Sequence, residues 1–197
     1  MKAPTPTRVL APAGTFMARV YSIIYLGTIK GEYLGEPTSS FKVRITWELP
    51  TKKHVFKEGE SEKPFSVSKE VTLSMGSKSR LRPLVEGMLG VSFTDDDAKS
   101  FDVDELLGKT CLLSITHKDS PNGKFVSVNS TSQIPEGMTC PPAINTPKIL
   151  SYENFDKEYF MTLPTFIKEK MEKTPEFIKM SGGTVEEEEI IAEDVPF

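Results

Sequence analysis

Aromatic and basic residues recur together along this sequence, and their types and spacing could serve binding to a charged polymer. In the segment 16–27 an arginine and two tyrosines share one alternation, and in 41–49 a lysine and an arginine alternate with apolar residues. Aromatic rings can stack on the bases of a single nucleic-acid strand, while cations follow its phosphates. The candidate binding residues are Arg19, Tyr21, Tyr25, Lys30, Tyr33, Lys42, Arg44, Trp47, Arg80, Arg82, Lys118, Lys124 and Phe125.

Each of these candidates also has a structural alternative. Trp47 lies on the apolar alternation of its segment, so a place in the core is more frequent for it than a stacking role. Tyr21 and Tyr25 fit either role equally, and a single basic residue is usually only solvated. Arg80 and Arg82 lie at an expected helix start, where free backbone N–H groups also favour phosphate. The prediction therefore depends on these residues converging on one face.

Catalytic motifs are scarce in this sequence. It contains no GxxxxGK[ST] phosphate loop and no GxGxxG after an expected strand. Asp95, Asp96 and Asp97 could hold a divalent metal for phosphodiester chemistry, but three acids also suit a solvated helix N-terminus. Cys111 and Cys140 stand too far apart for a zinc motif, and Cys111 reads as a small core residue. We expect no enzyme, no cofactor and no metal.

Charge is distributed unevenly along the chain. The net charge is -4, but residues 181–197 hold six acids and no base. The first 180 residues therefore hold 24 bases and 22 acids, which makes them slightly basic. A basic body that carries an acidic tail is consistent with nucleic-acid binding, despite the acidic overall charge.

The sequence ends on an apolar residue, a proline and an aromatic ring after two acids, namely Glu193, Asp194, Val195, Pro196 and Phe197. A ring beside an α-carboxylate fits a pocket with an apolar floor and a basic rim. This ending resembles the acidic tip of bacterial single-stranded DNA-binding proteins, with Glu193 in place of an aspartate. The resemblance implies that these five residues recruit replication, recombination and repair proteins.

A second resemblance concerns the body of the chain. The run KVRITWELP at 42–50 looks more like phage-encoded OB-fold single-strand binding proteins than like the bacterial housekeeping form. It implies an OB fold and a location in the cytoplasm of a bacterial host. Whether the chain forms a homo-oligomer stays open.

The patterns of apolar residues predict a mainly β fold with helical additions. They indicate strands over 16–27, 41–49, 65–75, 109–117 and 124–134, with a loop over 28–39, a helix after Ser79 and a hairpin at Asn122-Gly123. Pro50 should end the second strand, and Lys69 interrupts the apolar alternation of the third. This order is typical of a five-stranded OB-fold barrel, although a small β-sandwich could also produce it.

Four regions follow from these patterns. They are a flexible segment over 1–15, an OB-fold domain over 16–135, an extended crossing with a helical appendage over 136–180, and a disordered acidic tail over 181–197. The absence of a long apolar run or a secretion signal predicts a cytoplasmic protein that enters no membrane.

Together these features predict a protein that binds single-stranded DNA and recruits partners through its tip, while its acidic tail competes with DNA for the basic groove. Two alternatives remain: an OB-like interaction or inhibitor protein with no nucleic-acid role, and a nuclease subunit that uses Asp95 to Asp97.

Overall fold

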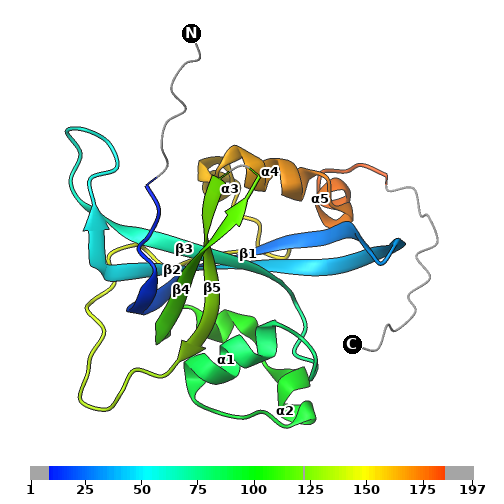
Figure 1. Ribbon diagram of the computed structural model, residues 1–197. Coiled ribbons are helices and arrows are strands. Elements are labelled where there is room, and N and C mark those ends of the chain that lie inside the picture. Colours follow the sequence, from blue (N-terminus) through cyan, green and yellow to red (C-terminus); the bar gives the residue numbers. More distant parts are fainter. Residues whose placement is uncertain (1–8, 122, 185–197) are drawn as a thin grey trace.

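The fold is a mainly antiparallel β-sheet with several short helices, shown in Figure 1. The computed structural model describes residues 9–121 and 123–184, and the side chain of Tyr33 is not described. The hydrogen-bonded strands follow the order β3-β2-β1-β4-β5, and β6 pairs in parallel with β1. The strands are β1 (Gly14–Tyr33), β2 (Glu36–His54), β3 (Lys63–Thr72), β4 (Thr110–Ser120), β5 (Gly123–Ser132) and β6 (Lys148–Leu150).

The helices form two groups, one before β4 and one after β6. The first group contains α1 (Leu81–Leu89), α2 (Asp95–Ser100) and the 3-10 helix η1 (Val103–Leu106). The second contains α3 (Lys157–Thr162), α4 (Thr165–Glu172) and α5 (Pro175–Met180). Figure 1 shows the two groups on opposite sides of the sheet. In the described part of the chain no helix is long and apolar enough to span a membrane.

The prediction of a mainly β fold with added helices is confirmed, but the region 28–39 is not a loop. There β1 and β2 continue as a paired ribbon that turns at Leu34 and Gly35. Both turn residues have positive φ, 53° and 86°, as a two-residue type I′ turn requires. Pro50 does not end β2 either, because the strand continues to His54 with an irregular register after Leu49.

Two apolar clusters cover the two faces of β1. The first lies between the sheet and α1 and includes Val20 and Ile23. The second lies beneath α3, α4 and α5 and includes Ile24 and Leu26. Successive side chains of a strand point to opposite faces, so Ile23 and Ile24 are both buried because both faces are covered. A β-bulge between Val20 and Ser22 shifts the alternation, which places Val20 and Ile23 in the same cluster.

The C-terminal helices are fixed to β1 by a group of hydrogen bonds around Gly27. The backbone N–H of Thr28 donates to Glu176 Oε2 at 2.9 Å, and the Tyr152 hydroxyl donates to the carbonyl of Leu26 at 2.9 Å. Gly27 has φ +91°, and a Cβ there would lie 2.8 Å from oxygens of Glu176, Thr174 and Tyr152. Only glycine fits this position without displacing the helices.

Helix α1 packs closely against β5 on the other side of the sheet. The Thr131 hydroxyl donates to the carbonyl of Leu84 at 2.6 Å, and a Cβ on Gly87 would lie 2.3 Å from the Thr131 carbonyl oxygen. The side chain of Lys69 joins the edge strands, because its Nζ donates to the carbonyl of Val128 at 2.7 Å. Strands β3 and β5 therefore lie near each other, although no backbone pairing between them is found in the described residues.

Candidate nucleic-acid interface

Lys69 places a positive charge at the seam between β3 and β5. It pairs with Ile45 and shares the core-facing side of β3 with Val67 and Val71, which are buried. Its long side chain is half-buried and reaches the Val128 carbonyl. Burial lowers the pKa of Lys69, and the positive charges of Arg80 and Lys118 lower it further. Arg80, which immediately precedes α1, and Lys118 on β4 are therefore close enough to Lys69 for their charges to act on it.

Lys42 adds a fourth cation from β2. Its Nζ donates to Thr72 Oγ1 at 2.7 Å. Burial lowers the pKa of Lys42, the charge of Arg80 lowers it further, and Glu70 opposes these effects. We call Lys42, Lys69, Arg80 and Lys118 the seam cluster.

The seam cluster has no ion-pair partner among the residues that the structure describes. Burial is the larger cause of the lowered pKa values of Lys42 and Lys69, but repulsion by Arg80 lowers both further, and repulsion by Lys118 lowers that of Lys69. A polyanion would relieve this repulsion, and phosphates would release their own counterions on binding. The cluster therefore has the electrostatics of a phosphate-binding surface.

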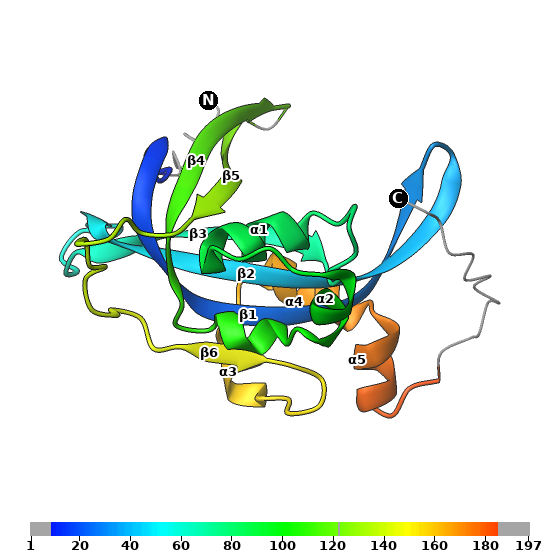
Figure 2. The ribbon, with the colours of Figure 1, turned by 90° about the horizontal axis from the view of Figure 1, so that it is seen from below.

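Two hairpins project from the sheet. In Figure 2 the β1–β2 hairpin and the β4–β5 hairpin both rise toward the top of the view, with β2 running between them. On the second hairpin Phe125 pairs directly with Lys118, and its ring is 44% exposed. Lys124 is also exposed there, and Lys30 lies on the first hairpin. A ring opposite a cation of the cluster is a suitable stacking position for a base.

The predicted common face of Arg19, Tyr21, Lys42 and Arg44 is partly covered by the chain itself, and its two arginines already have partners. Arg19 Nη2 donates to the carbonyl of Pro141 at 2.7 Å. Arg44 Nη1 binds Glu70 Oε1 at 2.9 Å. Residues 136–180 fold back over this face, which the strand alternation alone could not reveal. Of these four residues, the structure brings only Lys42 to the seam cluster.

Tyr25 and Trp47 belong to the core side of the sheet. Because of the bulge before Ser22, Tyr25 packs against the first apolar cluster. Its hydroxyl donates to Asp104 Oδ1 at 2.7 Å, and burial, followed by Asp104, raises its pKa. The exposed fraction of Trp47 is 0%, so this ring cannot stack on a base in the described conformation.

Arg82 is enclosed by acids rather than presented at the surface. Its Nε binds Glu86 Oε1 at 3.0 Å, its Nη1 binds Asp95 Oδ1 at 2.7 Å, and its Nη2 donates to the carbonyl of Phe93. Hydrogen bonding from Arg82 lowers the pKa of Asp95. The guanidinium therefore joins α1 to α2 and has little capacity left for a phosphate.

The acidic run at the start of α2 has structural partners. Besides the Asp95 pair, the backbone N–H of Asp97 donates to Thr94 Oγ1 at 3.2 Å, which caps the helix as expected. Asp96 lies 3.4 Å from Lys99. Within the described ranges no group of acids, cysteines or histidines could hold a metal ion.

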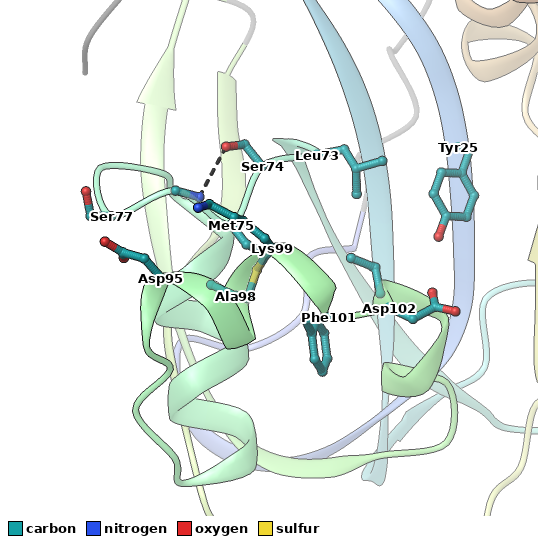
Figure 3. A pocket seen from close by; sticks show the side chains of 12 residues that line it. Tyr25, Leu73, Ser74, Met75, Ser77, Asp95, Ala98, Lys99, Phe101 and Asp102 are labelled. Atoms are coloured by element: carbon teal, nitrogen blue, oxygen red, sulfur yellow. Dashed lines mark hydrogen bonds between the residues drawn. The ribbon is translucent and has the colours of Figure 1, made fainter.

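A hollow of about 610 Å³ lies between α2 and the end of β3. Figure 3 shows Leu73, Met75 and Phe101 around the hollow, with Tyr25 at its right-hand edge. Its lining also contains two carboxylates, Asp95 and Asp102, and one ammonium group, Lys99. Those carboxylates would repel phosphate, so the seam cluster is the better path for a nucleic-acid backbone.

Some predicted positions cannot be placed. The side chain of Tyr33 and residues 193–197 lie outside the described part of the chain.

Lys69 was not predicted as a site residue. Its signal was present in the sequence, since a lysine on the apolar alternation of a strand is unusual unless its charge finds a partner.

No model of a known protein family matches this chain. No curated protein matches it either.

Proposed function

We propose that this protein binds single-stranded DNA along the seam cluster and catalyses no reaction. The observation that supports it most is the convergence of Lys42, Lys69, Arg80 and Lys118, which form no ion pair within the described residues. Half-buried lysines that are repelled by neighbouring cations gain free energy when phosphates approach. The exposed Phe125 ring opposite Lys118 adds a place for a base to stack.

The body is proposed to be an OB-fold barrel that closes between β3 and β5. The strand order fits it, with a helix between β3 and β4. The bond from Lys69 to the Val128 carbonyl lies where such a barrel would close. The first and last hairpins would then be the two loops that border the binding face of this fold.

The terminal residues 193–197 are proposed to recruit replication, recombination or repair proteins in a bacterial cytoplasm. This part rests on the sequence resemblance of the tip. The tail and the seam cluster have opposite charges, so the tail would also compete with DNA at low salt.

The test is a binding titration that uses fluorescence anisotropy of a labelled oligothymidylate. The double variant Arg80→Glu/Lys118→Glu reverses two exposed charges of the cluster, and Lys173→Glu/Lys179→Glu makes the same charge change on the C-terminal helices. A charged hydrogen bond is worth about 1.5–3 kcal/mol, so the first variant should bind at least about 100-fold more weakly. The control should lose less than about threefold, because its charges lie away from the phosphates. Equal losses in both variants would refute the proposed site.

The same titration separates the alternative functions. An interaction protein without a nucleic-acid role would leave the anisotropy unchanged, and a nuclease subunit would shorten the oligonucleotide when Mg²⁺ is added. The hydrogen bonds and ion pairs of Asp95 and Asp97 within α2 and with Arg82 disfavour the nuclease. Equal affinity for duplex DNA would contradict the single-strand preference.

A further inference from the structure

We propose that the C-terminal helices carry a second stacking surface for the same DNA strand, formed by Phe166 with Tyr21 and Tyr159. We call these three residues the aromatic strip. The inference rests on the proposed function, because it extends the path of the strand that the seam cluster binds. It gives the helices over 157–180 a part in binding, beyond covering the second apolar cluster.

Phe166 is the most exposed ring of the strip. It lies on α4, and 52% of its surface is accessible. The guanidinium of Arg44 lies 5.5 Å from the centre of the ring, so a cation already occupies one face. Because Phe166 is largely exposed, a base that stacked on the ring opposite Arg44 would form a layered arrangement of base, ring and guanidinium. A phenylalanine of the core would be covered by apolar neighbours, whereas Phe166 is largely exposed.

Tyr21 and Tyr159 place two more rings nearby. Tyr21 reaches across β2, because its hydroxyl donates to Ser66 Oγ on β3 at 3.1 Å. The hydroxyls of Tyr159 and Ser22 lie 2.8 Å apart, and the Lys148 ammonium lies 4.7 Å from the Tyr159 ring centre. Burial raises the pKa of Tyr159, and the neighbouring Tyr21 contributes to this rise. A ring from β1 and a ring from α3 are thus both held on this face by hydroxyl hydrogen bonds, and the Tyr159 ring has a cation beside it.

Two acids on this face, Glu70 and Glu48, have partners within the chain. Glu70 is bound by Arg44 at 2.9 Å and by Lys170 at 2.6 Å, which leaves one positive charge in excess. Glu48 is fully buried and accepts hydrogen bonds from both backbone and side-chain N–H groups of residues 144–145. The surface beside Phe166 is therefore positive, whereas the exposed Asp156 places a negative charge near Tyr159 and contributes to its raised pKa.

The strip is linked to the seam cluster through Lys42. Lys42 and Arg44 are two residues apart on β2 and point to the same face, which separates them by roughly 7 Å along the strand. Phe166 lies over Arg44, and Tyr21 binds Ser66, whose strand partner is Glu48. From Lys42 to Glu48 the path covers roughly 20 Å of β2. A strand bound at the seam would meet the aromatic strip next.

The first experiment compares variants of Phe166 in the full-length protein. Phe166→Ala and Phe166→Leu both remove the ring, and Leu keeps apolar bulk, whereas Phe166→Trp keeps a stacking surface. Met161→Ala is the matched control, because Met161 is 60% exposed on the neighbouring α3. We expect Ala and Leu to weaken binding of a 20-residue oligothymidylate about tenfold, Trp to restore it, and the control to bind as wild type. Thermal unfolding of each variant shows whether its fold is retained.

The second experiment needs no variant. An oligonucleotide that contains 5-iododeoxyuridine is irradiated on the wild-type protein, and the cross-linked peptides are identified by mass spectrometry. Cross-links at Phe166, Tyr21 or Tyr159 support the strip. Cross-links confined to the β4–β5 hairpin, with unchanged affinity in Phe166→Ala, would refute the strip and leave the proposed function intact. A wild-type protein that binds no single strand would refute both.

Discussion

The seam cluster and the face beneath the C-terminal helices contain the same kinds of residue in opposite surroundings. At the seam Lys69 and Lys118 repel each other and have no acidic partner among the described residues. Beneath the helices Arg44 binds Glu70, and Arg19 binds the carbonyl of Pro141. A cation paired in this way already has its charge compensated, so a phosphate gains less by approaching it. The surroundings, and not the residue type, therefore decide which cations remain for a ligand.

The strongest test of this contrast disrupts the contact between β1 and the C-terminal helices. Gly27→Ala adds a methyl group 2.8 Å from three oxygens and requires φ +91°, whereas Gly59→Ala requires a similar φ of +83° with nothing within 4 Å. The control should cost about 1–2 kcal/mol of unfolding free energy from backbone strain alone. Gly27→Ala should cost at least about 3 kcal/mol, since the clash adds to the strain. Chemical denaturation measures both, and equal losses would mean that the helices do not depend on this contact.

A second test exchanges the charge in each region for an apolar side chain of similar length. Lys69→Met should weaken oligonucleotide binding about tenfold, because it removes one charged phosphate contact. Arg44→Met should weaken binding less than about threefold but cost about 1 kcal/mol of stability, because Glu70 loses a partner. Anisotropy and thermal unfolding on the same samples give the two readouts. A larger binding loss in Arg44→Met would reverse the assignment of the two regions.

A third test uses the acidic tail as a probe of the cluster. Deleting residues 186–197 removes all six tail acids and should raise DNA affinity about threefold at low salt, with the gain vanishing as salt screens the charges. Deleting Phe197 alone keeps those acids, so DNA affinity should stay unchanged. A titration at low and at high salt distinguishes the two variants. An equal gain from both deletions would show that the ring, rather than the charge, competes with DNA.

The smallest expected effect concerns pH. Lys42 and Lys69 have lowered pKa values in the folded protein, first because of burial and then because of Arg80. DNA affinity should fall as the pH rises through these lowered values. Stability should rise over the same interval, because the unfolded chain still binds the protons that the folded lysines have released.

Arg80→Ala is the control for this pH dependence. It should move the midpoint of the affinity loss to higher pH, because it removes a repelling charge. Anisotropy at stepped pH values measures the midpoint. An unmoved midpoint would mean that Arg80 does not act on these lysines.

Much of the fold follows from the sequence, because period-two alternation is a local property. The strand around Ile45, helix α1 and the hairpin after Ser120 all lie where the patterns predict them. The paired ribbon at 28–39 was not predicted, because its turn needs a positive φ at Leu34 and leucine rarely adopts one. The short β6 was missed as well, since its pairing depends on β1 and not on its own residues.

The candidate site was less predictable than the fold, because contacts between distant residues decide it. The alternation of β2 placed Arg44 correctly away from the core, but nothing local shows that Phe166 would cover it. Tyr25 changed face through a bulge that no motif marks. Lys69 stood out in the sequence because it interrupts the apolar alternation of β3. Its hydrogen bond to the Val128 carbonyl on β5 explains why a lysine is tolerated there.

The position of β1, covered on both faces, has a consequence for synthesis. Ile24 and Leu26 leave the ribosome well before Leu150 and Met171, which eventually cover them. At 5–20 residues per second this interval lasts on the order of ten seconds. During that time a nascent chain displays an uncovered apolar strand, which is a site for chaperone binding or for aggregation. We therefore expect the yield of correctly folded protein to depend on how soon its last helices follow β1, and so on translation speed.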